Sequence, residues 1–436
     1  MSSATASSSE EPATGGAGPT GDDGMGGTMG STPVASDDFS AIYNPDFKEF
    51  VGEDCDVTEP MDVNNSKLPN PFEMLDGSSM AKKSQWACRR AEIKRAVEKY
   101  IEGTKPSKPE TVTGSVSSSQ IKVHVENGGK SLDFSVSLSL PGGTDGPVPA
   151  IIGLDGGSLD GAILKDEGVA TINLNNSTYE GISSQASRSG SFQTMYGSDL
   201  GTSALLAWGW AVSRIIDVLV DEKAAGRNDI VDPTGIGITG CSRLGKGAFV
   251  IGAFDERIAL GIPQESGTGG VASLRIVNTN PTGPNNNEPA QSIDSAWSED
   301  QGWFGSVFSK YKGSANTIPA DTHFMVAMYA PRGLLVLDNS RIGHLGAVAQ
   351  EGASMAGLEV FKALGVEKRM AYHGGRPDDP HNHCQFYPEQ EDALRRAIRA
   401  HLTRKDAPDG RMEPQPVATA DMTKWVDWET PTLSDD

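Results

Sequence analysis

The order of apolar runs and helical stretches is the feature that most restricts the fold of this chain. Seven apolar runs predict strands, and they begin at residues 121, 132, 149, 169, 235, 258 and 333. The run at 132 alternates with period two, as in an antiparallel edge strand, whereas the later runs are continuous, as in buried parallel strands. Helical stretches separate the later runs at 203–221, 244–253, 345–364 and 389–404. This order predicts an α/β fold, a three-layer αβα sandwich with a mixed, mostly parallel central sheet.

Composition divides the chain into one folded region between two polar ends. Residues 1–40 are rich in Ser, Thr, Gly, Ala and Pro and contain no Lys, Arg or aromatic residue before Phe39. Such a segment cannot bury enough apolar surface to offset its chain entropy, so we expect a disordered linker. Residues 41–405 are expected to form one α/β domain. Residues 406–436 are Pro- and Asp-rich, but Trp425 and Trp428 predict that part of this extension packs on the domain.

The charge balance argues against two classes of partner. The chain has 37 Lys and Arg against 58 Asp and Glu, a formal net charge of −21, which repels both nucleic acid and anionic lipid. The most apolar stretch, 205–220, is interrupted by Arg214 and Asp217 and is too short to span a membrane. The N-terminus shows no basic segment followed by an apolar one, so a secreted form is expected to have lost its signal peptide.

The segment "GIGITGCSRLGKGAF" at 235–249 is the strongest local signal of chemistry. It combines a short apolar strand, a small-residue turn that contains Ser242, and a helix. This arrangement is typical of a nucleophile elbow, which exposes a serine hydroxyl and directs the following N–H groups at a developing oxyanion. Gly240 stands two residues before the serine, but Leu244 rather than Gly stands two after it, and Gly245 follows. The G-x-S-x-G pattern is therefore half met.

The same residues nearly form a phosphate-binding loop. Gly240, Gly245 and Lys246 have the required spacing, and Asp338 at the end of a later strand could bind the magnesium ion. Gly247, however, stands where a Ser or Thr hydroxyl should meet the metal. A nucleotide hydrolase and an ordinary glycine-rich turn therefore remain as alternatives to the elbow.

The loop "YHGGRPDDPHNHCQF" at 372–386 offers the base that a serine nucleophile needs. It lies between a predicted strand and the last helix and contains His383. The loop could instead bind zinc through His373, Asp378, Asp379, His381 and His383. Ligands packed so densely in a Gly- and Pro-rich segment more often form a solvated turn. Asp338 stands where enzymes of this architecture commonly place the acid that orients the base.

Four cysteines could link these segments. They are Cys55, Cys88, Cys241 and Cys384, which allow three pairings that spacing alone does not distinguish, and four buried thiols are the alternative. Cys241 adjoins Ser242, and Cys384 adjoins His383. A bond between these two cysteines would therefore hold the candidate nucleophile beside its base.

The blocks "GCSRLGKGA" and "HCQF" together resemble the signature pair of carbohydrate esterase family 15, the glucuronoyl esterases. The blocks "LPNPFEMLDG", "SQWACRRAEIKRAVEKYIEG", "ALLAWGWAVSRIID" and "APRGLLVLDN" extend the resemblance over roughly residues 45–405. The resemblance implies an α/β-hydrolase fold and secretion, without a cofactor or a metal. It also implies a serine esterase, expected to be monomeric, that cleaves the ester between 4-O-methyl-glucuronic acid of glucuronoxylan and an alcohol of lignin. An inactive homologue that only binds glucuronoxylan is the alternative.

The resemblance assigns roles to particular residues. It makes Ser242 the nucleophile, His383 the base, Arg243 an oxyanion contact and Glu265, in "GIPQESGTGG", the acid. Asp338 remains the alternative acid.

Sugar contacts and disulfides follow from the same resemblance. Lys246, Gln291 and Glu299 match sugar-binding positions, and the implied pairings are Cys55–Cys88 and Cys241–Cys384. One departure concerns His344, which stands where fungal members have a Trp, so an aromatic contact to the sugar is altered.

Overall fold

The computed structural model describes residues 43–143, 146–279, 289–375, 382–413 and 419–435. All of these residues belong to one compact unit. The linker predicted at 1–40 lies outside the described residues. No helix in the described part of the chain is long and apolar enough to cross a membrane.

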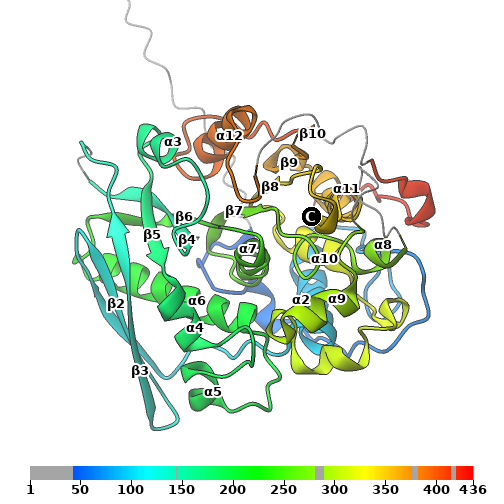
Figure 1. The fold of residues 1–436 in the computed structure, drawn as a ribbon, viewed down its shortest axis with the longest axis horizontal. Helices are drawn as coiled ribbons and strands as arrows, with labels where there is room; N and C mark the ends of the chain where they lie inside the picture. The colour runs from blue at the N-terminus through cyan, green and yellow to red at the C-terminus, as the bar shows by residue number, and fades with distance from the viewer. Residues whose placement is uncertain (1–42, 144–145, 280–288, 376–381, 414–418, 436) are drawn as a thin grey trace, which may run out of the picture. The chain divides into compact units, whose positions relative to one another are not determined.

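One ten-stranded sheet forms the centre of this unit (Figure 1). The strand order is β1-β2-β3-β5-β4-β6-β7-β8-β9-β10. The strands are β1 (Thr111–Val116), β2 (Gln120–Asn127), β3 (Lys130–Ser139), β4 (Val148–Leu154), β5 (Ala170–Leu174), β6 (Val231–Cys241), β7 (Ile258–Gln264), β8 (Gly333–Leu337), β9 (Met370–His373) and β10 (Met412–Glu413). The pairings from β1 to β3 and between β3 and β5 are antiparallel, and all the others are parallel. The predicted mixed, mostly parallel sheet is confirmed.

The prediction that the run at 132 forms an edge strand is wrong. This run is β3, which pairs with β2 on one side and β5 on the other. The edge is β1, whose sequence "TVTGSV" contains too few large apolar residues to stand out as a strand. Alternation identified the antiparallel pairing of β3, but it could not reveal a weakly apolar neighbour.

Helices cover both faces of the sheet. They are α2 (Trp86–Val97), α3 (Gly161–Asp166), α4 (Asn176–Ile182), α5 (Ser191–Tyr196), α6 (Ala204–Ala224), α7 (Arg243–Phe254), α8 (Leu274–Thr279), α9 (Ile293–Glu299), α10 (Thr322–Met328), α11 (Ala347–Ala363) and α12 (Glu391–His401). The four predicted helices correspond to α6, α7, α11 and α12. Apolar side chains of α3 and α12 belong to one buried cluster, and those of α6, α7, α10 and α11 belong to the other, larger one. Figure 1 shows the helices arranged around the sheet. This is the expected three-layer sandwich.

The C-terminal segment packs on the domain mainly through Trp428, one of the two tryptophans that were expected to do so. The indole N–H of Trp428 donates to the carbonyl of Leu68 at 2.9 Å, and its ring meets the Phe72 ring edge-on at 5.8 Å. Leu433 is also buried. The chain end thus covers the segment that leads into α2.

A buried carboxyl outside the site gives the fold a pH-dependent stability. Glu102 is 1% exposed and accepts a hydrogen bond from the Ser203 hydroxyl at 2.5 Å, and burial raises its pKa from 4.5 to about 8. Between about pH 4.5 and 8 the folded chain therefore holds a proton that the unfolded chain releases, so this group lowers stability progressively as pH rises.

We predict that Glu102→Gln gains stability relative to the parent as pH increases from 5 to 8. Glutamine keeps an acceptor for Ser203 but never ionises, so the difference should reach on the order of 5 kcal/mol above pH 8, at about 1.4 kcal/mol per pKa unit. Urea unfolding at several pH values measures it. A difference that stays constant with pH would contradict the raised pKa.

Candidate active site

Ser242 alone connects β6 to α7. Its backbone has φ 59° and ψ −126°, a conformation that non-glycine residues rarely adopt. Its N–H donates to the carbonyl of Gln264 on the neighbouring strand β7 at 2.9 Å. The strand therefore turns into the helix within one residue, as a nucleophile elbow requires, and the first N–H groups of α7 lie beside the serine.

The glycine spacing around the serine has a steric reason. A Cβ atom on Gly240 would lie 2.4 Å from the Leu244 carbonyl oxygen, and one on Gly245 would lie 2.3 Å from the Gln264 carbonyl oxygen. Gly245, rather than residue 244, is thus the position where α7 approaches β7 most closely. This contact accounts for the departure from the G-x-S-x-G pattern.

The same turn does not form a phosphate-binding loop. Such a loop needs several residues between strand and helix to surround the phosphates, and here only Ser242 separates β6 from α7. Asp338, the proposed magnesium ligand, is fully buried, and its carboxylate accepts hydrogen bonds from Tyr372 (2.7 Å) and Gln350 (2.6 Å). The geometry therefore does not support nucleotide hydrolysis.

The structure brings Glu265 to His383. Nδ1 of His383 lies 2.5 Å from Oε2 of Glu265, which also accepts the N–H of Cys384 at 2.9 Å. Glu265 is fully buried at the end of β7 and has a positive φ of 48°. Because the carboxylate engages Nδ1, it fixes the ring orientation and directs the other nitrogen, Nε2, away from Glu265. Asp338 instead accepts hydrogen bonds from the Asn339 N–H, Gln350 and Tyr372.

Both predicted disulfides are confirmed. Cys55 bonds to Cys88, and Cys241 bonds to Cys384. The second bond joins the residue before Ser242 to the residue after His383. One ligand-type atom from each of Cys241, Glu265, His383 and Cys384 lies within 4.8 Å of the others. The two sulfurs are bonded to each other, so they are not available as the thiolates that zinc prefers.

Part of the alternative metal site can be located. Nδ1 of His373 accepts the N–H of Gly375 at 3.2 Å, and Nε2 lies 3.9 Å from a carboxylate oxygen of Glu413. His383 engages Glu265 instead. The remaining predicted ligands, Asp378, Asp379 and His381, lie outside the described residues.

A cavity of about 360 Å³ opens beside Ser242. Its lining includes Asp155, Ser242, Arg243, Glu299 and Trp303. Arg243 is exposed and begins α7, so its side chain belongs to the same opening as the serine. A polar cavity with one aromatic wall is suited to a sugar-sized ligand.

Lys246 lies one helical turn after Ser242 and is almost fully buried, 4% exposed. Its Nζ donates to the Ser266 carbonyl at 2.5 Å and lies 4.6 Å from the centre of the Trp303 ring. Burial lowers the pKa of this ammonium to about 7, and the nearby Glu299 carboxylate partly opposes that shift. The lysine can therefore present the remaining N–H groups to a polar ligand near Trp303.

The other predicted sugar-binding residues meet on neighbouring segments. Nε2 of Gln291 donates to Glu299 at 2.5 Å, and the backbone N–H of Gln291 donates to the carbonyl of His344 at 2.9 Å. The His344 ring is exposed, and its centre lies 5.8 Å from that of His383. His344 therefore stands between the sugar-binding residues and the base.

Four residues at or near the site were not predicted. Asp155 and Trp303 line the cavity, whereas Asn339 donates a hydrogen bond to Glu265 and Gln350 donates one to Asp338. An aromatic residue in the acidic segment 299–303 was a usable signal for Trp303. Nothing in the local sequence distinguishes Gln350 from other polar residues of α11.

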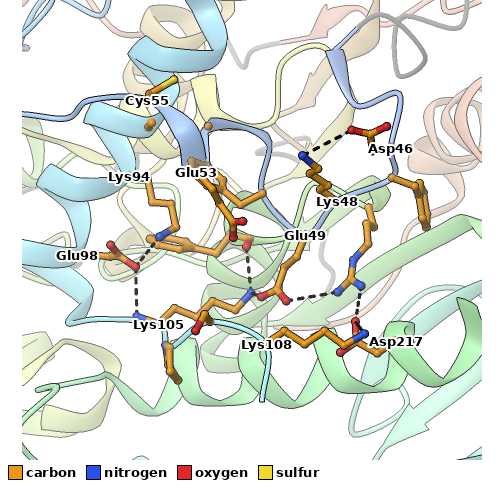
Figure 2. A pocket seen from close by; sticks show the side chains of 18 of the residues that line it. Asp46, Lys48, Glu49, Glu53, Cys55, Lys94, Glu98, Lys105, Lys108 and Asp217 are labelled. Carbon is orange, nitrogen blue, oxygen red and sulfur yellow. Dashed lines mark hydrogen bonds and ion pairs between the residues drawn. The ribbon is translucent and has the colours of Figure 1, made fainter. Parts of the chain in front are cut away.

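A second cavity, of about 640 Å³, lies elsewhere (Figure 2). It is formed by the segment 46–57, α2 and α6 and contains none of the predicted catalytic residues. Its charges pair with one another: Lys105 with Glu49 at 2.6 Å, and Lys94 with Glu98 at 2.8 Å. Glu49 also pairs with Arg214 of α6, so these ion pairs anchor the N-terminal segment to that helix.

Comparison with known proteins places these residues in a family. A family model described as "Glucuronyl esterase, fungi" matches residues 123–365. A 4-O-methyl-glucuronoyl methylesterase of Neurospora crassa is 38% identical over 372 residues, which cover 85% of this chain and 90% of that protein. One of Thermothelomyces thermophilus is 38% identical over 377 residues, with the same coverage.

Solved structures give the same result. The glucuronoyl esterase catalytic domain from Hypocrea jecorina superposes with a TM-score of 0.76 at 35% identity, covering 87% of this chain and 99% of that one. A serine-to-alanine mutant of the Sporotrichum thermophile enzyme, in complex with methyl 4-O-methyl-β-D-glucopyranuronate, gives 0.77 at 35% identity and covers 88% and 100%. The predicted family and fold are confirmed.

The short contact between His383 and Glu265 predicts a proton resonance far downfield of the amide protons, at a pH where the imidazole is charged. Glu265→Gln should abolish this resonance, because the amide is a weaker acceptor. Asp338→Asn should retain it. One-dimensional proton spectra of the three proteins test the assignment, and loss of the resonance only in Asp338→Asn would contradict it.

Proposed function

The chain belongs to the fungal glucuronoyl esterase family within carbohydrate esterase family 15, and we propose that it hydrolyses the ester between 4-O-methyl-glucuronic acid of glucuronoxylan and an alcohol of lignin. It is a carboxylic ester hydrolase, as its relatives are. The observation that carries the finer proposal is the hydrogen bond of Glu265 to His383, in a segment that a disulfide ties to the residue preceding Ser242.

In the proposed first half-reaction, Oγ of Ser242 attacks the ester carbonyl carbon and His383 Nε2 accepts its proton. The carbonyl oxygen becomes an oxyanion, stabilised by N–H groups at the start of α7 and by the Arg243 guanidinium. Glu265 stabilises the imidazolium through Nδ1–H. The C–O bond to the alcohol then breaks, His383 protonates the departing oxygen, and a glucuronoyl ester remains on Ser242.

In the second half-reaction, water replaces the alcohol. His383 removes a proton from the water as its oxygen attacks the acyl carbon, and a second oxyanion forms in the same place. When the bond to Ser242 breaks, His383 returns the proton to Oγ. Glucuronic acid leaves and the enzyme is regenerated. Every step uses a group of this chain, so the proposal requires no cofactor.

Substrate recognition is proposed to rest on the cavity lined by Trp303. Lys246, Gln291 and Glu299 would bind the hydroxyls of the uronate ring, while Trp303 would contact its apolar face. His344 replaces an aromatic contact with a smaller ring that can also donate or accept a hydrogen bond. Activity as a secreted monomer is part of the proposal, and the two disulfides support the extracellular setting.

An inactive glucuronoxylan-binding homologue is the alternative. It would need the cavity but not the strained serine turn or the oriented histidine, both of which are present. Turnover of benzyl glucuronate distinguishes the two functions in one assay.

Ser242→Ala should reduce hydrolysis of benzyl glucuronate to below a hundredth of the parent rate, because the hydroxyl forms the covalent intermediate. That factor corresponds to on the order of 3 kcal/mol of barrier. Calorimetric titration with glucuronate and thermal unfolding should be unchanged. Residual turnover above a hundredth of the parent rate would contradict the assignment of Ser242 as the nucleophile. Loss of parent activity in EDTA, restored by zinc, would instead support a metal site.

Lys246→Ala should reduce kcat/KM for benzyl glucuronate at least tenfold more than for an aryl acetate. The ammonium is proposed to bind ring hydroxyls that acetate lacks, so only the larger substrate loses contacts. Steady-state kinetics on both substrates measure the difference. Equal losses would refute a role in sugar binding.

A further inference from the structure

Asp338, which the proposed mechanism does not use, lies at the centre of a buried hydrogen-bond network. It follows β8 directly and is fully buried. Oδ1 accepts Nε2 of Gln350 at 2.6 Å and the N–H of Asn339 at 2.7 Å, and Oδ2 accepts the Tyr372 hydroxyl at 2.7 Å. A buried carboxyl with this many donors acts as a fixed acceptor.

One branch of the network reaches Glu265. Nδ2 of Asn339 donates to Oε1 of Glu265 at 3.3 Å, on the carboxylate whose other oxygen binds His383. The Glu265 N–H also donates to the Leu337 carbonyl at 2.7 Å, just before Asp338. The segment around Asp338 therefore contacts both the backbone and the carboxylate of the proposed acid.

The other branch reaches Lys246. Oε1 of Gln350 accepts the Ser266 hydroxyl at 3.0 Å and the Gly267 N–H at 3.1 Å. The Ser266 carbonyl in turn accepts Nζ of Lys246 at 2.5 Å. The turn that holds the lysine is thus fixed by the amide of Gln350.

We propose that Asp338 is a positioning residue. Through Asn339 it fixes the position of Glu265, and through Gln350 it fixes the turn that binds Lys246. The physical reason is the orientation of the Gln350 amide. An acceptor at Asp338 attracts Nε2 and so directs Oε1 at Ser266 and Gly267, whereas a reversed amide would place its NH₂ group against the N–H of Gly267. The roles of Glu265 and Lys246 rest on the proposed function.

The charge state of Asp338 fits this role. Burial, reinforced by the nearby Glu265 carboxylate, raises the pKa of Asp338 to about 7, against the hydrogen bonds from Tyr372, Asn339 and Gln350. The ionisable groups that interact with it are Glu265, Tyr372 and Glu351. Well below this pKa the carboxyl carries a proton, and the protonated oxygen then donates to the Tyr372 oxygen instead of accepting from it, while the other oxygen still accepts Gln350 and Asn339. An asparagine reproduces this protonated form, because its oxygen accepts Gln350 and Asn339 and its NH₂ group donates to Tyr372.

Two variants test the two branches of the network one at a time. Gln350→Leu should raise KM for benzyl glucuronate five- to tenfold and leave aryl acetate kinetics within twofold, because the lysine turn loses its two contacts to Gln350 while Asn339 keeps its contact to Glu265; Asp338 also loses one of its donors. Asn339→Leu should lower kcat about tenfold on both substrates, because Glu265 loses its contact to Asn339 while the contacts of Gln350 to the lysine turn remain; the N–H of Arg341 also loses its acceptor on Asn339. Asp338→Ala should show both effects, and Asp338→Asn should restore each kinetic parameter to within threefold at pH 6.

The matched control is Ser354→Ala. Ser354 lies on α11 with Gln350, is equally buried, and its hydroxyl makes no hydrogen bond with the described residues. This variant should leave both substrates unchanged, and thermal unfolding of every variant reports its stability. If Asp338→Ala does not fold, Gln350→Leu, Asn339→Leu and Asp338→Asn still test the proposal.

Two results would overturn the proposal. Equal losses on both substrates in Gln350→Leu would mean a general structural role. A loss above a hundredfold in Asp338→Asn would make Asp338 the acid itself. Failure of the proposed function can be distinguished from failure of this proposal. It would appear as turnover in Ser242→Ala, whereas the kinetic differences among the Gln350, Asn339 and Asp338 variants would be unchanged.

Discussion

The parallel pairing of β6 with β7 is the constraint on which the site depends. Cys241 lies opposite Gln264 at the carboxyl ends of these strands, so the next residues, Ser242 and Glu265, leave the sheet side by side. The N–H of Ser242 is held by the Gln264 carbonyl. A shift of one residue in this register would separate the proposed nucleophile from the proposed acid, whatever the identity of either residue.

Ser242, Glu265 and Cys384 all carry positive φ without being glycine, and so does Asp155, which follows β4 at the same edge. Such backbone conformations are unfavourable and persist only where neighbouring contacts enforce them. Here the enforcing contacts are the strand pairing, the Cys241–Cys384 bond and the hydrogen bonds that Glu265 accepts. The stable sheet thus maintains a strained arrangement in which the histidine is hydrogen-bonded to the carboxylate and its segment is tied by a disulfide to the residue before the serine.

The sequence predicts some parts of this arrangement better than others, for physical reasons. Ser242 could be predicted because the strand, turn and helix around it are contiguous in the sequence. His383 could be predicted because it adjoins a cysteine. Glu265 has no local signal; only the family resemblance favoured it over Asp338, since both follow buried strands. Asn339 and Gln350 reach the site through tertiary contacts between β8, α11 and the turn after β7, which periodicity does not report. Strands as weakly apolar as β1 were missed for a related reason: their burial depends on partners rather than on their own composition.

The measurement that tests the central claim most directly is detection of the acyl-enzyme. The parent protein would be mixed with benzyl glucuronate, quenched in acid within milliseconds, digested and analysed by mass spectrometry. The account predicts a glucuronoyl adduct on the peptide that contains Ser242, with accumulation rising in Glu265→Gln if the second half-reaction is slowed more than the first. Active enzyme that gives no adduct on that peptide, or an adduct on a different residue, would contradict it.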